Sequence, residues 1–169
     1  QKWVADITYI WTAEGWLYLA VVLDLYSRMV IGWGMSSRMT ADLVCLALLM
    51  ALQWRVPCRE LIHHSDRGGQ YISQALQDLF AQHHIRPSIG SRGDCYDNAA
   101  MESFFATLKR ECVHRHTFPT RDAARLAIFD YIETFYNRVR RHSTLDYYSP
   151  YDFEQCYYQN LSQSQSTPP

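Results

Sequence analysis

The sequence predicts an α/β fold in which helices flank a mixed five-stranded sheet. Residues 1–36 hold three closely spaced segments rich in β-branched and aromatic residues, a pattern typical of an antiparallel meander. From residue 40 onward, helical patterns alternate with two short apolar strand patterns, and helices that join consecutive strands favour parallel pairing. With 169 residues, of which 48% are hydrophobic, the chain is long enough to bury the core of one domain.

Local signals set the expected limits of each element. A turn at residues 12–15 separates the first two strands, Thr40 caps the first helix and Pro57 ends it. Asp97 or Asn98 caps the helix that carries the later motifs. The expected strands cover residues 3–11, 16–25, 28–35, 61–64 and 85–89, and the expected helices cover 40–54, 70–84, 97–111 and 120–142. We expect one domain over residues 1–150 and a largely irregular or disordered tail over 151–169.

Composition indicates which compartment and which kinds of partner to expect. The five cysteines are odd in number and lack a Cys-x-x-Cys pair, which favours reduced thiols in a cytoplasm. No apolar run approaches the roughly 18 residues of a membrane span, so we expect no membrane association. Because the chain begins at Gln1, we expect a fragment that lacks an N-terminal neighbour. The net charge is −1, but residues 109–142 hold eight Lys or Arg against four acids, which suits either a phosphate-binding face or a solvated helix.

Three acidic residues have sequence environments that suggest a functional role. Asp6 lies in an apolar strand, where an unpaired carboxylate is costly unless a metal or partner compensates it. Asp66 follows a buried strand, and there it either joins a ligand site or caps a turn. Glu102 lies two helical turns before Lys109, so that both border the apolar face of an amphipathic helix. Oxygen ligands of this kind indicate Mg²⁺ or Mn²⁺ and not zinc.

The chain resembles a known family at several motifs. They are W-x-x-D-I-T at 3–8, H-S-D-R-G-G-Q-Y at 64–71, Y-D-N-A-A-M-E-S-F-F-x-x-L-K at 96–109, F-Y-N-R-x-R-R-H-S-T-L at 135–145 and S-P at 149–150. In order and spacing, with 35 residues between Asp66 and Glu102, they resemble the retroviral-integrase-like catalytic core of OrfA/OrfB-type bacterial insertion-sequence transposases. The chain departs at Gly69, where the family often has Ser, and at Asp146, where Gly is common.

The resemblance implies an RNase H-like fold and a DDE transposase core over residues 1–150. It implies that Asp6, Asp66 and Glu102 hold two Mg²⁺ ions, with Mn²⁺ as a substitute, for DNA strand cleavage and strand transfer at element ends. It also implies a homo-oligomer on DNA, a separate N-terminal DNA-recognition domain and a place in the bacterial cytoplasm, at the nucleoid during function. The expected DNA contacts are Lys109, Gln70, Arg92, Tyr96, Arg138, Arg140 and Arg141.

Several alternatives stay open from the residues alone. Asp24 either adds a fourth carboxylate to the site or bonds the turn that follows it. His64 is a candidate hydrogen-bond donor behind Asp66. The remaining His and Cys residues lack the paired spacing of a zinc site. At the level of function, the rivals are a hydrolytic nuclease of the same fold and a non-catalytic DNA-binding module.

Overall fold

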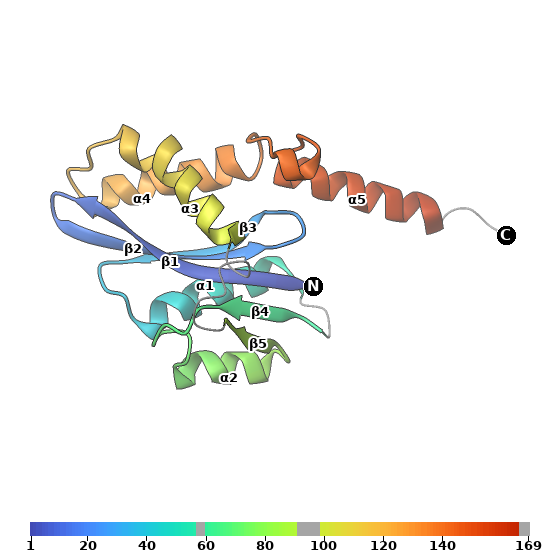
Figure 1. Cartoon of the computed structure of the whole chain (residues 1–169), viewed down its shortest axis with the longest axis horizontal. Helices are drawn as coiled ribbons and strands as arrows, with labels where there is room; N and C mark the ends of the chain where they lie inside the picture. The colour runs from blue at the N-terminus through green and yellow to red at the C-terminus, as the bar shows by residue number, and fades with distance from the viewer. Residues whose placement is uncertain (57–59, 91–98, 166–169) are drawn as a thin grey trace.

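The computed structural model of the chain describes residues 1–56, 60–90 and 99–165, with side chains described up to residue 160. Five strands form one sheet in the order β3-β2-β1-β4-β5 (Figure 1). The strands are β1 (Lys2–Thr12), β2 (Gly15–Asp24), β3 (Val30–Ser36), β4 (Ile62–Ser65) and β5 (Arg86–Ile89). The first three pair antiparallel, whereas β4 pairs parallel to both β1 and β5, as the sequence predicts.

Helices cover both faces of the sheet, as Figure 1 shows. The main helices are α1 (Ala41–Trp54), α2 (Gln74–Gln82), α3 (Ala99–Glu111), α4 (Arg121–Asp130) and α5 (Pro150–Gln165). One core cluster joins Trp3 and Ala5 of β1 to α1 and α2, and the other joins Val4 and Ile10 to α3 and α4. Because side chains alternate along a strand, Asp6 shares the face of Val4 and therefore faces α3.

One close contact fixes how α1 packs on the sheet. A Cβ added at Gly32 of β3 would lie 2.1 Å from the carbonyl oxygen of Ala47 and 2.8 Å from the backbone nitrogen of Ala51. No side chain fits at such separations without moving backbone. Gly32 therefore lets α1 lie directly against the sheet edge, where β3 has no further strand beside it among the described residues.

Two segments differ from their predicted form. The helix expected over 120–142 ends as an α-helix at Asp130, continues as a π-helical turn over Tyr131–Tyr136 and then breaks into turns. The helix expected from residue 70 begins at Gln74, because the backbone N–H of Tyr71 donates to the carbonyl of Gly68 in a turn.

The prediction of an irregular tail is wrong for residues 150–165, which form α5. Ser149 caps this helix: its hydroxyl accepts from the Asp152 N–H at 3.1 Å and donates to the Asp152 carboxylate at 2.8 Å. Glu154 forms an ion pair with Arg55 at the end of α1, and both side chains are largely buried. In the described ranges no helix has the length and apolar character needed to cross a membrane.

Candidate active site

The register of the sheet brings Asp6 and Asp66 to neighbouring positions. Ala5 of β1 pairs with Ser65 of β4, and each aspartate is the next residue along its own chain. Asp66 therefore lies at the carboxyl end of β4, beside the middle of β1. The Oδ1 atom of Asp6 accepts from the Ile7 N–H at 2.7 Å, and the Oδ1 atom of Asp66 accepts from the Gly68 N–H at 2.9 Å. These backbone bonds orient both carboxylates, and the second is the turn-capping bond expected for Asp66.

A buried tyrosine feels the charges of both aspartates. Tyr71 is 3% exposed, and its hydroxyl has no hydrogen-bond partner among the described residues. Burial and then the charges of Asp6 and Asp66 raise the pKa of Tyr71 well above its ordinary value. The hydroxyl thus lies within electrostatic reach of both carboxylates. The sequence analysis missed this residue, although it stands five positions after Asp66 in a quoted motif.

Helix α3, which carries Glu102, lies alongside β1. Its C-terminal end is fixed on the strand by Lys109, whose Nζ lies 5.2 Å from the centroid of the Tyr9 ring. Glu102 lies seven residues before Lys109, about 10 Å along a helix, and Asp6 lies three residues before Tyr9, about 10 Å along a strand. The chain soon after α3 contacts the β1–β2 turn through an Ala13–Phe118 backbone bond, so α3 and β1 run in the same direction. Glu102 is therefore carried to the level of Asp6.

The acids do not form a closed cluster. Across residues 1–56, 60–90 and 99–160, no three His, Cys, Asp or Glu side chains lie close enough together to hold a metal ion. Glu102 is exposed on α3, and Asp66 is exposed beyond β4. The assignment of Asp6, Asp66 and Glu102 as a metal-binding triad thus stays a prediction, although the fold carries all three to one region.

The predicted DNA contacts have different surroundings. Arg92 and Tyr96 lie outside the described residues. Gln70 is half-buried and its side chain donates to the Met39 carbonyl at 3.2 Å, and the guanidinium of Arg138 lies 5.3 Å from the Tyr151 ring centroid. Arg141 is exposed and its side chain makes no ion pair within the described part of the chain.

Arg140 is engaged in a different way from Arg141. Its guanidinium donates to the Glu111 carboxylate at the end of α3, with distances between 3.0 and 3.3 Å, and Tyr131 donates to the same carboxylate at 2.8 Å. Burial favours the neutral acid, but these hydrogen bonds outweigh it and hold the pKa of Glu111 below its ordinary value. Arg140 thus links the turn that follows the π-helical segment to the C-terminal end of α3.

Other candidates from the sequence prove structural. Asp24 is 3% exposed, and its carboxylate accepts from the N–H groups of Tyr26 and Ser27 and from the Gln1 side chain. This confirms the bond to the following turn. The Nδ1 atom of His64 lies 3.1 Å from the Ser88 hydroxyl of β5. A Cβ at Gly69 would meet nothing within 4 Å, so the departure from Ser leaves the turn sterically unchanged.

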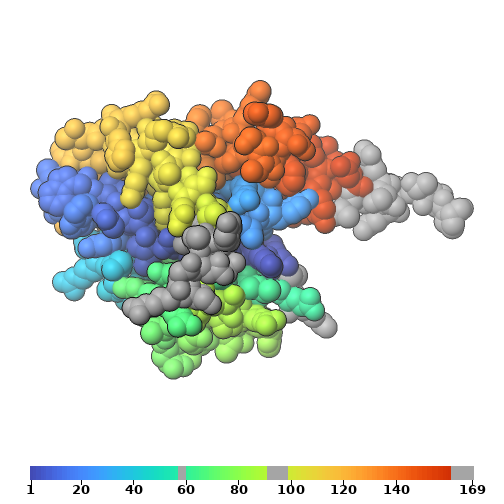
Figure 2. All heavy atoms as spheres, in the orientation of Figure 1, coloured from blue at the N-terminus to red at the C-terminus, as the bar shows by residue number. Residues whose placement is uncertain are grey.

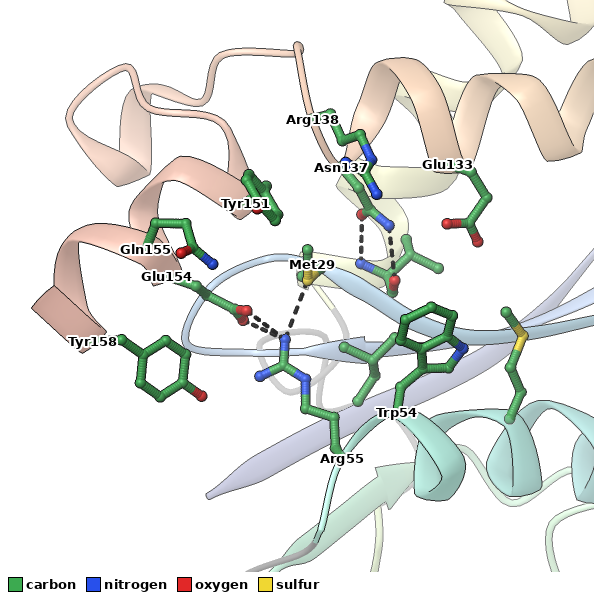
Figure 3. A pocket seen from close by; sticks show the side chains of 13 residues that line it. Met29, Trp54, Arg55, Glu133, Asn137, Arg138, Tyr151, Glu154, Gln155 and Tyr158 are labelled. Carbon is green, nitrogen blue, oxygen red and sulfur yellow. Dashed lines mark hydrogen bonds and ion pairs between the residues drawn. The ribbon is translucent and has the colours of Figure 1, made fainter.

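A cleft of about 300 Å³ lies away from the acids, between β3, the end of α1, the π-helical turn and α5 (Figure 3). Asn137 on its wall pairs with the exposed edge of β3, accepting from the Val30 N–H at 3.0 Å and donating to the Val30 carbonyl at 2.9 Å. At its floor Arg55 binds Glu154. None of the three acids lines this cleft, and Arg55, Glu154 and Asn137 on its walls are already hydrogen-bonded within the protein.

Comparison with known proteins agrees with this architecture. A mixed sheet of this order, with one acid within the central strand β1 and another just after the end of the neighbouring β4, defines an RNase H-like, integrase-type core. The family model described as "Integrase core domain" matches residues 1–95, and a second model of the same description matches residues 83–150. The chain belongs to the integrase core domain family.

Curated relatives refine the family. The chain is 56% identical over 154 residues to "Transposase InsF for insertion sequence IS3A" of Escherichia coli, a match that covers 91% of this chain and 54% of that protein. It is 48% identical over 159 residues to "Insertion element IS600 uncharacterized 31 kDa protein" of Shigella sonnei, covering 94% and 58%. These likenesses confirm the predicted resemblance to insertion-sequence transposase cores. The chain spans about half the length of these relatives.

Solved structures confirm the predicted fold. A chain of the cryo-EM structure of the simian T-cell lymphotropic virus intasome in complex with PP2A regulatory subunit B56 gamma has a TM-score of 0.72 at 19% identity, over 90% of this chain and 53% of that chain. The HTLV-2 integrase catalytic core domain in complex with magnesium (trimeric form) has a TM-score of 0.68 at 16% identity, over 90% and 95%.

Proposed function

We propose that this chain is the catalytic core of a DDE transposase, which cleaves DNA strands at the ends of an insertion element and joins the freed 3′ hydroxyl to target DNA. The observation that carries the proposal is the registered placement of Asp6 and Asp66 on neighbouring strands beneath the helix that carries Glu102. Membership of the integrase core domain family and the transposase relatives support it.

The donor set fits a divalent metal. Asp6 and Asp66 offer hard oxygen ligands that their backbone bonds already orient, and Glu102 approaches from α3. We propose that these three residues hold two Mg²⁺ ions, for which Mn²⁺ substitutes. When bound, such ions activate the attacking oxygen and stabilise the departing one in phosphoryl transfer. In this scheme no protein side chain acts as a covalent nucleophile.

Tyr71 is a further candidate, because its hydroxyl is buried without a hydrogen-bond partner and the charges of Asp6 and Asp66 raise its pKa after burial does, so it would bond one carboxylate or a water in the loaded site. Tyr71→Phe is expected to weaken Mn²⁺ binding about tenfold, the lower end of the range for groups behind metal ligands, while the melting temperature without metal stays near that of the parent. Calorimetric Mn²⁺ titration measures this, with Tyr157→Phe on α5 as a matched control. Equal Mn²⁺ affinities for the two variants would remove Tyr71 from the site.

DNA is the proposed partner, and a homo-oligomer would hold two element ends together. Lys109 would meet DNA close to the scissile phosphate, because it lies two turns from Glu102 on the same helix face. Gln70, Arg92, Tyr96, Arg138 and Arg141 are proposed as further contacts. An N-terminal DNA-recognition domain and a bacterial cytoplasmic location also remain proposals.

Arg140 and Arg141 are expected to differ, although they are neighbours. Arg140→Ala leaves the one-fifth-exposed Glu111 carboxylate with only the more distant and exposed Arg110 guanidinium at 3.4 Å, so we expect a stability loss of about 2 kcal/mol, reduced from the fully buried case by solvent screening. Arg141→Ala is expected to keep the melting temperature and lower the salt slope of DNA binding by about one unit. Thermal melts and affinities across a salt series measure both. An unchanged slope for Arg141→Ala would end its assignment to the DNA face.

A strand-transfer assay tests the proposed function. The chain is mixed with a labelled duplex that carries an element end, a target duplex and Mn²⁺, and joined products are separated by size. The proposal expects labelled strands joined to target. Cleaved but never joined strands would favour a hydrolytic nuclease, and DNA binding without cleavage would favour a non-catalytic module.

A further inference from the structure

Three large aromatic side chains lie exposed together near the β1–β2 turn. Tyr9, Trp11 and Trp16 are 55%, 60% and 42% exposed, and we call them the hairpin aromatic patch. The Trp16 ring meets both others edge to face, at 5.0 Å and 83° from Tyr9 and at 4.8 Å and 74° from Trp11. Edge-to-face contacts leave ring faces available, and burying aromatic area of this size in a complex is strongly favourable.

Cations border the hairpin aromatic patch. The Lys109 ammonium lies on the Tyr9 ring, and the Nε atom of Arg121 donates to the Trp16 carbonyl at 3.1 Å. The acid at the turn, Glu14, already accepts from the Arg121 backbone N–H at 2.8 Å. Exposed rings with basic groups beside them suit a partner that is aromatic and anionic at once.

The patch lies along β1 beyond the acids, and because side chains alternate along a strand, Tyr9 and Trp11 lie on the face opposite Asp6. β1 pairs with β4 only through Ala5, so within the described chain its Ile7–Thr12 stretch has no strand on that side. Tyr9 lies about 10 Å from Asp6 along β1, at the level of Lys109. Figure 2 shows the hairpin end, in blue, lying against the α3 and α4 segments in yellow. Lys109 of α3 reaches the Tyr9 ring at this unpaired side of β1, so a strand that leaves the acids and crosses this edge would reach the patch.

We propose that the hairpin aromatic patch stacks unpaired bases of the DNA strand that enters or leaves the active site. Nucleobases match the open ring faces, and their phosphates match Lys109 and Arg121. This inference rests on the proposed function and extends it to the form of the substrate: an end with unpaired nucleotides and not a fully paired one. A neutral protein partner would use the same apolar area but would leave Lys109 and Arg121 without an anion.

The test compares two duplexes of equal length, one blunt and one with a short unpaired tail. The 169-residue chain should bind the tailed duplex more tightly, and Trp11→Ala should lose about tenfold in affinity for it, as expected for one stacked base. Affinity for the blunt duplex should be unchanged, and Trp11→Phe should restore most of the preference. Trp54→Ala is the matched control, since Trp54 is 73% exposed at the end of α1, outside the patch.

The outcomes separate this inference from the proposed function. If the parent joins DNA strands but Trp11→Ala binds both duplexes as the parent does, the patch does not stack bases and the transposase proposal stands. If Trp11→Ala changes only the oligomeric state, measured by sedimentation, the patch is a protein interface and the inference is wrong. A parent that neither binds nor joins DNA would overturn both.

Discussion

Glu102→Gln is expected to reduce DNA cleavage and joining by about 10³-fold or more, while the fold and DNA affinity remain close to those of the parent. A carboxylate that helps hold a catalytic metal contributes several kcal/mol to the transition state, and each 1.36 kcal/mol is a factor of ten in rate. Glu102 is exposed and adds nothing to the packing of α3, which depends on the buried Met101, Phe104 and Leu108. The amide keeps the size of the side chain and removes only its charge.

Single-turnover cleavage, thermal melting and binding to a labelled duplex together measure this outcome. Glu60→Gln serves as the control, because Glu60 is exposed just before β4 and lies outside the three acids. Cleavage at the parental rate would show that Glu102 has no catalytic role. A large drop in melting temperature would show that it is structural.

The central sheet could be predicted because its signals are local. Three closely spaced segments rich in β-branched and aromatic residues predict the antiparallel strands, and the helix before residue 61 predicts the switch to parallel pairing. Parallel pairing of β4 with β1 does not by itself bring Asp6 and Asp66 level, because that also needs the register in which Ala5 pairs with Ser65. The three acids were predicted from their sequence environments and from the resemblance to transposase cores.

The parts that could not be predicted depend on contacts between distant residues. Asn137 bonds Val30 across 107 positions, and Arg55 holds α5 through Glu154 across 99. A short stretch of sequence carries no signal of contacts between such distant residues. One continuous basic helix was therefore predicted where the chain forms a π-helical turn. The Ser149 cap of α5 is local, and the sequence analysis passed over it because the segment that follows is polar. Tyr71 was not predicted as a site residue because an aromatic residue that follows a turn is usually part of the hydrophobic core.

The stability of the fold is expected to fall steeply in mild acid because of His63. This side chain is 2% exposed and packs 4.9 Å from the Phe80 ring, and burial lowers its pKa from 6.5 to about 4. Below pH 6.5, His63 of the unfolded chain therefore binds a proton, whereas the buried His63 of the folded chain stays neutral. The free energy of unfolding thus decreases as the pH falls toward 4. At about 1.36 kcal/mol per pH unit, the free energy of unfolding falls by about 3 kcal/mol in all, and about 2 kcal/mol of this is lost between pH 6.5 and pH 5.

Urea unfolding between pH 7 and pH 5 isolates this effect, because most carboxylates stay ionised in that window. His63→Phe keeps an aromatic ring against Phe80 and should remove about half of the pH dependence. His142, whose pKa is also lowered to about 4 by burial and then by the Arg140 charge, accounts for a comparable remaining slope. His114→Asn, at an exposed position, should leave the slope as it is in the parent. If the parent is equally stable at pH 7 and pH 5, the folded protein protonates His63 as readily as the unfolded chain does, and the core around Tyr71 and His63 is open to water.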